Sequence, residues 1–238
     1  MVRRALAGAV VLAAVTACGV LPSPPEPLDT DFVPSLEPSP YLQADVAADG
    51  FTYQEHYAVR IRVATCTGWS TGSGWILNES QVVTNEHVVA GATSIEVTTY
   101  DGRDYIATYS QVAPVADLAL LTLDPVFTEW ATWEIRDLED DESIYVVGYP
   151  DGQAMHTSRG HFWGPTADDV GDTGEDVWEL EAEVHPGSSG SPLYAEDGVV
   201  VGTIYAGDDH GYAMAWPNTY LKDLLDGTVV WLPNEPSC

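Results

Sequence analysis

The feature that most constrains the fold is an alternation of apolar and polar side chains with a period of two residues, which begins after Gly50. This period is typical of half-buried β-strands, whereas an amphipathic helix repeats every 3.6 residues. The candidate strands cover residues 57–64, 74–77, 81–84, 94–100, 105–112 and 118–123, and then 143–149, 155–163, 177–184, 191–194, 199–206 and 212–216. We therefore expect an all-β domain.

Residues 124–142 divide these strands into two sets of six, because this stretch is polar and poor in strand-forming residues. Two equal sets suggest two six-stranded antiparallel β-barrels side by side, although the strand count alone equally allows a sandwich. One short C-terminal helix is expected over residues 218–226, with Asn218 as its N-cap and Gly227 ending it. The 21 Gly, 16 Pro and 10% aromatic residues also favour short strands and turns over a helical bundle.

Residues 1–17 have the pattern of a secretion signal peptide, since Arg3 and Arg4 precede an apolar run that ends at Ala17. The run is shorter than the roughly 20 residues that a membrane-spanning helix needs. The segment Val-Thr-Ala-Cys that ends at Cys18 resembles a bacterial lipobox, in which the cysteine becomes the lipid-modified N-terminus. We expect a lipoprotein anchored through Cys18 on the extracytoplasmic face of a bacterial membrane; the alternative is an ordinary secreted protein.

The next segment, residues 18–50, is acidic and holds seven prolines between Pro22 and Pro40. Proline removes backbone donors and like charges repel, so a semi-extended tether is expected. The alternative is a loop that belongs to the domain. The folded domain itself is expected over residues 51–238.

The charge balance restricts the partners of the chain. Eight Lys and Arg residues stand against 37 Asp and Glu residues, which gives a formal net charge of −29. Such a chain repels polyanions, so binding to nucleic acid or unaided binding to an anionic lipid surface is not expected.

A serine in the segment HPGSSGSP, residues 185–192, has the surroundings of a nucleophile. An attacking hydroxyl needs small neighbours, and the oxyanion formed on attack needs backbone N–H groups that no side chain obstructs. Ser189 is the candidate nucleophile, and Gly187 and Ser189 are the candidate oxyanion donors. Glycine and serine are also ordinary turn residues, so a plain surface loop is the alternative.

One histidine stands at the end of an apolar strand, which would hold it rigidly while leaving it accessible. His87 follows the strand within GSGWILNESQVVTNEHVV, residues 72–89, and is the candidate general base. The remaining histidines considered, which have no such setting, are interpreted as surface or core residues: His56, His156, His161 and His210.

An acid, Asp117, precedes the wholly apolar strand that begins at Leu118. Burying a carboxylate costs several kcal/mol unless a donor satisfies it, and an imidazole N–H is a suitable donor. Asp117 is therefore the candidate partner of the histidine; the alternative is an acid in a turn at a strand end.

Together these motifs resemble a trypsin-like serine peptidase of the HtrA type. The resemblance lies in TGSGWIL, VVTNEHVV, ADLALLTL and GSSGSPL, and in the order His, Asp, Ser, and it spans about residues 57–225. It implies a double β-barrel with His87, Asp117 and Ser189 as a catalytic triad in the cleft between the barrels. It also implies that Ile204, Tyr205 and Ala206 pair with the substrate backbone.

Four positions depart from the pattern of this family. Glu86 replaces a small residue before the histidine, Ser188 stands where asparagine is common, and Ser191 replaces a glycine. Pro186 restricts the conformations available to the loop before the nucleophile. No PDZ module is expected after the peptidase domain.

The expected activity is that of a serine endopeptidase acting by acyl transfer on peptides or proteins, without a cofactor. A catalytically silent binding or scaffold module is the main alternative, and an esterase using the same triad is another. No metal site is expected, because the histidines and cysteines lack ligand spacing. The sequence does not indicate the oligomeric state.

Two further expectations concern cysteines and specificity. With Cys18 lipidated, Cys66 and Cys238 remain in a compartment that permits disulfides, and we expect them to pair; two separate thiols are the alternative. We expect cleavage after small or medium apolar residues such as Ala, Val or Leu. Glu183 lies six residues before Ser189 and would instead select Lys or Arg if it lined the pocket, but its alternation with apolar residues places it on an acidic, solvated face.

Overall fold

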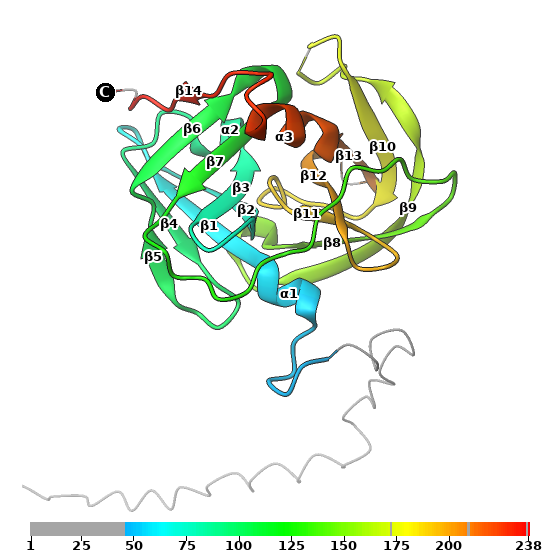
Figure 1. Cartoon of the computed structure of the whole chain (residues 1–238), viewed down its shortest axis with the longest axis horizontal. Helices are drawn as coiled ribbons and strands as arrows, with labels where there is room; N and C mark the ends of the chain where they lie inside the picture. The colour runs from blue at the N-terminus through cyan, green and yellow to red at the C-terminus, as the bar shows by residue number, and fades with distance from the viewer. Residues whose placement is uncertain (1–45, 172, 209, 237) are drawn as a thin grey trace, which may run out of the picture. The chain divides into compact units, whose positions relative to one another are not determined.

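The computed structural model describes residues 46–171, 173–208, 210–236 and 238, all of which belong to one compact unit, Pro40–Cys238. Two antiparallel β-sheets form this unit (Figure 1). Three short α-helices accompany them: α1 (Tyr53–Tyr57), α2 (Glu86–Val89) and α3 (Asn218–Leu225). Two 3₁₀ turns, η2 (Pro114–Ala116) and η3 (Pro150–Gly152), lie between strands.

The N-terminal sheet has eight strands in the order β14-β6-β7-β3-β2-β1-β4-β5. Its strands are β1 (Ala58–Ala64), β2 (Trp69–Ile76), β3 (Gln81–Asn85), β4 (Ser94–Thr98), β5 (Asp104–Ile106), β6 (Tyr109–Ala113), β7 (Leu118–Thr122) and β14 (Leu232–Pro233). The expected six-stranded first barrel is therefore wrong in this detail, because the sheet is open, with β14 and β5 at its edges.

Two local features explain the extra strands. The single strand expected over residues 105–112 is split, because the N–H of Ala107 donates to Ile95 while that of Thr108 donates to the carbonyl of Thr122. The chain thus changes partner strand between two consecutive residues. The second addition is β14 near the C-terminus, which pairs with β6 through Leu232 and Val112.

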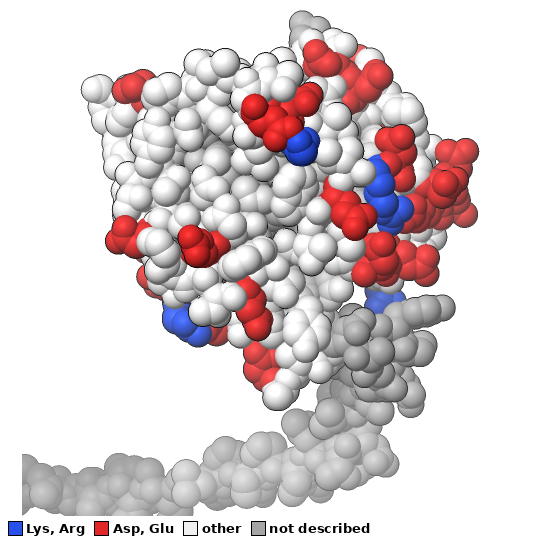
Figure 2. Space-filling model, viewed as in Figure 1, with Lys and Arg blue, Asp and Glu red and all other residues white. Residues whose placement is uncertain are grey.

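The C-terminal sheet is a closed six-stranded barrel in the order β10-β13-β12-β11-β8-β9, as expected for the second set of strands. Its strands are β8 (Ser143–Gly148), β9 (His156–Ala167), β10 (Asp176–Ala182), β11 (Pro192–Ala195), β12 (Val200–Gly207) and β13 (Tyr212–Pro217). Acidic side chains outnumber basic ones on the face shown in Figure 2, in keeping with the composition.

Each sheet has its own apolar core, and a third cluster joins the two sheets. Trp75 of β2 and Trp216 of β13 belong to this joining cluster and are fully buried. Burial of one such ring stabilises the fold by about 5 kcal/mol on the basis of its area. The indole N–H of Trp75 also donates to Thr203 of β12 at 3.1 Å, which fixes the two sheets against each other.

Helix α3 corrects one detail of the sequence prediction. Its N-cap is Pro217 and not Asn218, whose side chain does not cap the helix. The Asn218 amide donates instead to the carbonyls of Val200 and Glu134, at 2.8 and 3.1 Å. The buried Asn218 amide thus bonds two carbonyls outside the helix instead of capping it. Gly227 follows the helix end with a positive φ of 76°.

Candidate active site

His87 and Asp117 are brought together by neighbouring strands of the N-terminal sheet. His87 lies in α2, directly after β3, and Asp117 directly precedes β7, which pairs with β3 through Asn85 and Leu118. One Asp117 carboxylate oxygen accepts the backbone N–H of His87 at 2.9 Å, and the other lies 2.6 Å from His87 Nδ1. An ionised carboxylate only accepts, so Nδ1 carries a proton and Nε2 is the basic nitrogen.

The backbone of Asp117 is adapted to this contact. It has a φ of 41° in the left-handed region, at the end of the turn η2. Its carbonyl accepts the side-chain amide of Asn85 at 2.9 Å and the N–H of Glu86 at 3.1 Å. Asn85 at the end of β3 and Glu86 at the start of α2 therefore hold the Asp117 backbone beside His87, whose side chain is still 49% exposed.

Ser189 is supplied by the C-terminal barrel, in the loop between β10 and β11. Its Oγ donates to the carbonyl of Tyr205 at 3.4 Å, which is a long hydrogen bond. Among the described residues, no hydrogen bond joins Ser189 to His87. Gly72 of β2 lies between the segments that carry these two residues. A Cβ added at Gly72 would lie 2.6 Å from Val88, the neighbour of His87, and 3.2 Å from the carbonyl oxygen of Ser189.

The backbone around Ser189 leaves two N–H groups without an acceptor in the described part of the chain, those of Gly187 and Ser189. The neighbouring N–H groups are all bonded: Ser188 to His185, Gly190 to Ile204 and Ser191 to Ser188. Gly187 has a φ of 92°, which a side chain would strain. These are the two donors expected from the sequence, and their unbonded state is the property that an oxyanion site requires.

The segment Ile204–Ala206 lies beside the nucleophile, but its three residues differ in availability. The N–H of Ile204 donates to Ser191 and its carbonyl accepts from Gly190, so its backbone is already bonded on both sides. Substrate pairing with Ile204 would have to compete with these bonds, and it stays a prediction. Tyr205 is the bulged residue between Ile204 and Ala206 in the pairing of β12 with β13, where Ala206 is paired with Met214. The substrate pairing of Tyr205 and Ala206 likewise stays a prediction.

A pocket of about 460 Å³ adjoins Ser189. Val184, Ile204 and Ala206 supply apolar lining, and His185 and His210 supply imidazoles. The close contact of Val184 with Gly207, where an added Cβ would meet Val184 Cγ2 at 2.0 Å, limits the space near that strand. Glu183 is absent from this lining.

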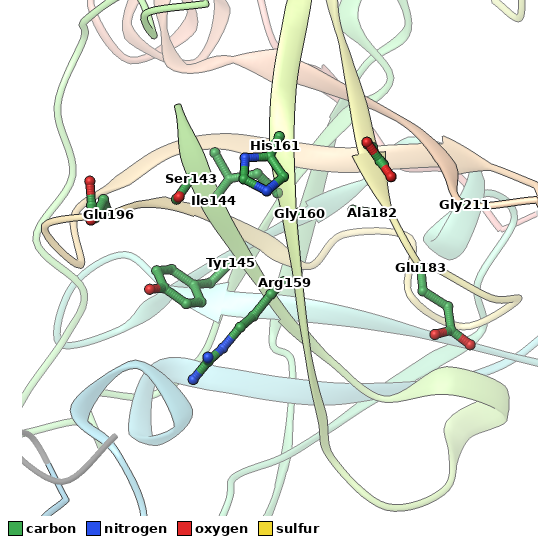
Figure 3. Close-up of a pocket in the computed structure, with 11 residues that line it drawn as sticks. Ser143, Ile144, Tyr145, Arg159, Gly160, His161, Ala182, Glu183, Glu196 and Gly211 are labelled. Carbon is green, nitrogen blue, oxygen red and sulfur yellow. The ribbon is translucent and has the colours of Figure 1, made fainter. Parts of the chain in front are cut away.

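A second pocket, of about 550 Å³, lies on the outside of the closed barrel over β8, β9 and β10 (Figure 3). Glu183 lines this outer pocket, with its side chain 72% exposed and its carboxylate 3.1 Å from His185 Nε2. The guanidinium of Arg159 lies over the Tyr145 ring, 5.5 Å from its centroid. The placement of Glu183 agrees with an acidic, solvated face.

Asp168, which sequence reasoning missed, supports the site through Tyr205, whose hydroxyl it binds and whose carbonyl accepts Ser189 Oγ. It is only 3% exposed, and its carboxylate accepts the Tyr205 hydroxyl at 2.7 Å, the Thr173 hydroxyl at 2.8 Å and the N–H groups of Gly171 and Val170. Burial raises the pKa of Asp168, but these donors outweigh it and the net shift is downward. Burial, followed by Asp168, raises the pKa of Tyr205, so this hydroxyl stays protonated. An acid in a strand-end turn gave no sequence signal of this role.

Glu86, one of the departures from the family pattern, lies beside the His87–Asp117 pair. Its pKa is raised, first by partial burial and then by the negative charge of Asp117, while His87 acts in the opposite sense. The residue thus adds a second carboxyl group to the surroundings of the imidazole.

The remaining expectations have different outcomes. Cys66 and Cys238 form a disulfide, with 5.8 Å between their Cα atoms. Cys18, the signal peptide and most of the expected tether lie outside the described residues. Within the described ranges, no helix is long and apolar enough to cross a membrane.

Comparison with known proteins places these features in a family. The family model for the trypsin-like peptidase domain matches residues 72–202, more than half of the chain. The chain belongs to the trypsin-like peptidase family. The match covers the candidate residues His87, Asp117 and Ser189.

Relatives of this chain include an HtrA protease and a DegP-like protease. The serine protease Do-like HtrA of Bacillus subtilis (strain 168) is 30% identical over 173 residues, which cover 66% of this chain and 38% of that protein. A probable periplasmic serine endoprotease, DegP-like, of Chlamydia muridarum is 31% identical over 163 residues, covering 65% of this chain and 33% of that protein. The chain thus spans less than half the length of these curated relatives.

The fold of the trypsin-like peptidase domain is also that of a solved relative. The active form of the Rv3671c protease from M. tuberculosis matches with a TM-score of 0.66 at 26% identity, covering 73% of this chain and 81% of that one. The all-β architecture with a barrel and a second curled sheet is therefore that of a trypsin-like protease.

Proposed function

We propose that this chain is a serine endopeptidase that hydrolyses peptide bonds through Ser189, His87 and Asp117. The observation that carries the proposal is the pair of unbonded N–H groups at Gly187 and Ser189, next to a serine hydroxyl, in a loop whose other N–H groups are bonded. Most backbone donors in folded proteins have a partner, so two neighbouring N–H groups that have none beside a serine hydroxyl support a site for a negative oxygen. Membership of the trypsin-like peptidase family supports the same conclusion.

The mechanism follows from these positions. His87 Nε2 takes the proton of Ser189 Oγ as the oxygen attacks the carbonyl carbon of the substrate, and Asp117 stabilises the imidazolium that results. The negative oxygen of the tetrahedral intermediate accepts the N–H groups of Gly187 and Ser189. His87 then gives the proton to the leaving amine, and water releases the acyl group from Ser189. The long contact of Ser189 with Tyr205 must be exchanged for one with His87 when substrate binds.

A fluorophosphonate probe tests the competence of the nucleophile. It should label the wild-type protein at Ser189, and neither Ser189→Ala nor His87→Ala should be labelled. Ser188→Ala is the matched control, because it removes a hydroxyl one residue away from the candidate nucleophile. Failure of the wild-type protein to react would overturn the enzyme proposal and favour a binding or scaffold module.

The lining of the pocket beside Ser189 supports cleavage after Ala, Val or Leu. Val184 and Ala206 present apolar surface, and Glu183 lies in the outer pocket. Peptides that differ only in Val or Arg before the cut bond test this specificity in the wild-type protein and in Glu183→Gln. We expect preference for Val and an unchanged ratio in the variant; selective loss of Arg cleavage in Glu183→Gln would restore Glu183 as the specificity residue.

We also propose that the peptidase is tethered outside a bacterial cell membrane by a lipid on Cys18, through residues 18–50. The lipobox-like segment supports the anchor, and the Chlamydia relative carries a periplasmic name. Growth with radiolabelled palmitate tests it: the wild-type chain should take up label in the membrane fraction and Cys18→Ser should not. Label in both chains, or in neither, would contradict the anchor.

A further inference from the structure

Ser73 of β2 is fully buried where the N-terminal sheet meets the loop that carries the candidate oxyanion donors. Its backbone N–H donates to the carbonyl of Ser189 at 2.8 Å, and its Oγ lies 2.7 Å from the carbonyl of Gly187. Its own carbonyl accepts the Thr84 hydroxyl at 2.7 Å. One residue of the N-terminal sheet thus binds both carbonyls that flank the central part of this loop.

The direction of the Ser73 hydroxyl is determined by a third contact. The backbone N–H of Tyr149 donates to Ser73 Oγ at 2.9 Å. A hydroxyl has a single proton, and a carbonyl only accepts, so that proton must point to the carbonyl of Gly187. The hydroxyl is therefore a fully satisfied link from Tyr149 to Gly187.

The directions of the two unbonded N–H groups depend on how the neighbouring peptide groups of the loop are held. The carbonyl of Pro186, which shares a peptide plane with the N–H of Gly187, accepts the N–H of Asp151 at 2.6 Å. The carbonyl of Gly187 is held by Ser73, and that of Ser188 by Ser191. In a trans peptide the carbonyl and N–H point in opposite directions, so the bonds to the carbonyls of Pro186 and Ser188 turn the free N–H groups of Gly187 and Ser189 to the opposite side. Ser73 holds the peptide between these two, whose own N–H, that of Ser188, donates to His185.

We propose that Ser73 is a positioning residue for the oxyanion site: its side-chain hydroxyl fixes the peptide between Gly187 and Ser188, which joins the two peptides that carry the free N–H groups, and so keeps the N–H groups of Gly187 and Ser189 directed together toward the substrate. The proposal rests on the proposed peptidase function. Ser73 touches neither substrate nor reacting atoms and acts only through the loop. Because an oxyanion site works by being organised in advance, loosening it should lower the rate of the chemical step more than substrate binding.

A matched control lies in the same region. Ser191 is also fully buried, two residues after the candidate nucleophile, but its Oγ has no hydrogen-bond partner in the described part of the chain. Ser73→Ala and Ser191→Ala therefore each remove one buried hydroxyl near the loop. Only the first removes bonds to Gly187 and Tyr149.

Steady-state kinetics on an Ala- or Val-containing peptide and amide hydrogen exchange test the role of Ser73. Ser73→Ala should lower kcat about tenfold to a hundredfold with KM changed by less than about twofold, because a supporting bond is worth less than a direct oxyanion donor. Its affinity for a peptide boronic acid should fall by a similar factor, while that for the same peptide with an unreactive end should not. Ser191→Ala should keep the wild-type kcat.

Hydrogen exchange supplies a readout that does not need activity. In Ser73→Ala the N–H groups of Ser188, bonded to His185, and of Gly190, bonded to Ile204 of β12, should exchange faster, and in Ser191→Ala they should keep wild-type rates. Equal kcat and equal exchange in the two variants would overturn the role of Ser73 while leaving the peptidase intact. An inactive wild-type protein would overturn the proposed function, and the exchange comparison would still decide whether Ser73 holds the loop.

Discussion

The two sheets of this domain contribute to the candidate site in different ways. The open N-terminal sheet supplies the side chains His87 and Asp117, which bind each other directly at the ends of adjacent strands. The closed C-terminal barrel supplies Ser189 and a loop of backbone donors, whose arrangement depends on bonds to many neighbours. A pair of side chains can be specified by two residues, whereas an oriented backbone loop needs support from outside itself.

The sheets also differ in how their edges are protected. The barrel has no free edge, while the N-terminal sheet ends in β5 and β14. Near the C-terminus of the chain, β14 covers β6, and the disulfide between Cys66 and Cys238 joins the chain end to the loop between β1 and β2. The amide of Asn234 donates to the carbonyl of Val89 in α2, the helix that carries His87. One edge of the open sheet is therefore covered by a segment distant in sequence, whereas the barrel closes with its own six strands.

Breaking the side-chain pair should have the largest effect. In Asp117→Asn the amide N–H competes for His87 Nδ1 and favours the wrong tautomer, so kcat/KM should fall by about four orders of magnitude. Glu183→Gln, which alters an exposed carboxylate, is the control and should keep wild-type activity toward a Val substrate. Peptide hydrolysis followed over the same pH range measures both; an Asp117→Asn enzyme within tenfold of wild type would argue against the assigned role.

Removal of the disulfide should destabilise the N-terminal sheet more than the C-terminal barrel. The double variant Cys66→Ser with Cys238→Ser opens the loop that the disulfide closes between residues 172 positions apart. On the chain-entropy estimate this lowers the free energy of unfolding by up to about 5 kcal/mol. Hydrogen exchange should increase in β14, β6 and α2 before it increases in β8–β13. Uniform loss of protection in both sheets would show that they unfold as one unit.

A smaller effect is expected at Asp168, whose carboxylate accepts the hydroxyl of Tyr205 in β12. Asp168→Asn replaces one acceptor with a donor among several buried donors, which should cost about 2–3 kcal/mol at neutral pH. Because the pKa of Asp168 is lowered in the folded state, its ionised form stabilises the fold above its ordinary pKa, and this stabilisation is lost as the pH falls through the folded-state pKa. Urea unfolding from pH 7 to pH 3 should show the variant approaching wild type in acid, with exposed Asp176→Asn unchanged throughout.

The smallest effect should be found at Glu86. Its raised pKa means that the folded state disfavours the ionised carboxyl, so the wild-type protein is slightly destabilised above that pKa. Glu86→Gln should increase the free energy of unfolding by about 0.5 kcal/mol at pH 7, a value discounted for partial exposure, and by nothing below the ordinary pKa of glutamate. Thermal melts at pH 7 and pH 3.5 measure the difference; a less stable variant at pH 7 would contradict the role of burial.

Much of the architecture was accessible from local sequence patterns. A period of two residues predicted most strands, and the segments around His87, Asp117 and Ser189 predicted the residues that now lie at strand and loop ends. These signals are local because a strand alternates along itself and because a nucleophile needs small immediate neighbours. The same alternation predicted the six consecutive strands of the second set, and the resemblance to trypsin-like peptidases implied that they close into a barrel.

Only the tertiary structure decided the open form of the first sheet, the addition of β14 and the bonds that hold the oxyanion loop. Ser73 and Gly187 are 114 positions apart, and Asp168 and Tyr205 are 37 apart, so no window of sequence contains either contact. Buried polar groups take whichever partner the packing of distant segments brings within about 3 Å. Alternation along one strand carries no information about that partner, and this is why the candidate side chains were visible in the sequence and the groups that orient the backbone around them were not.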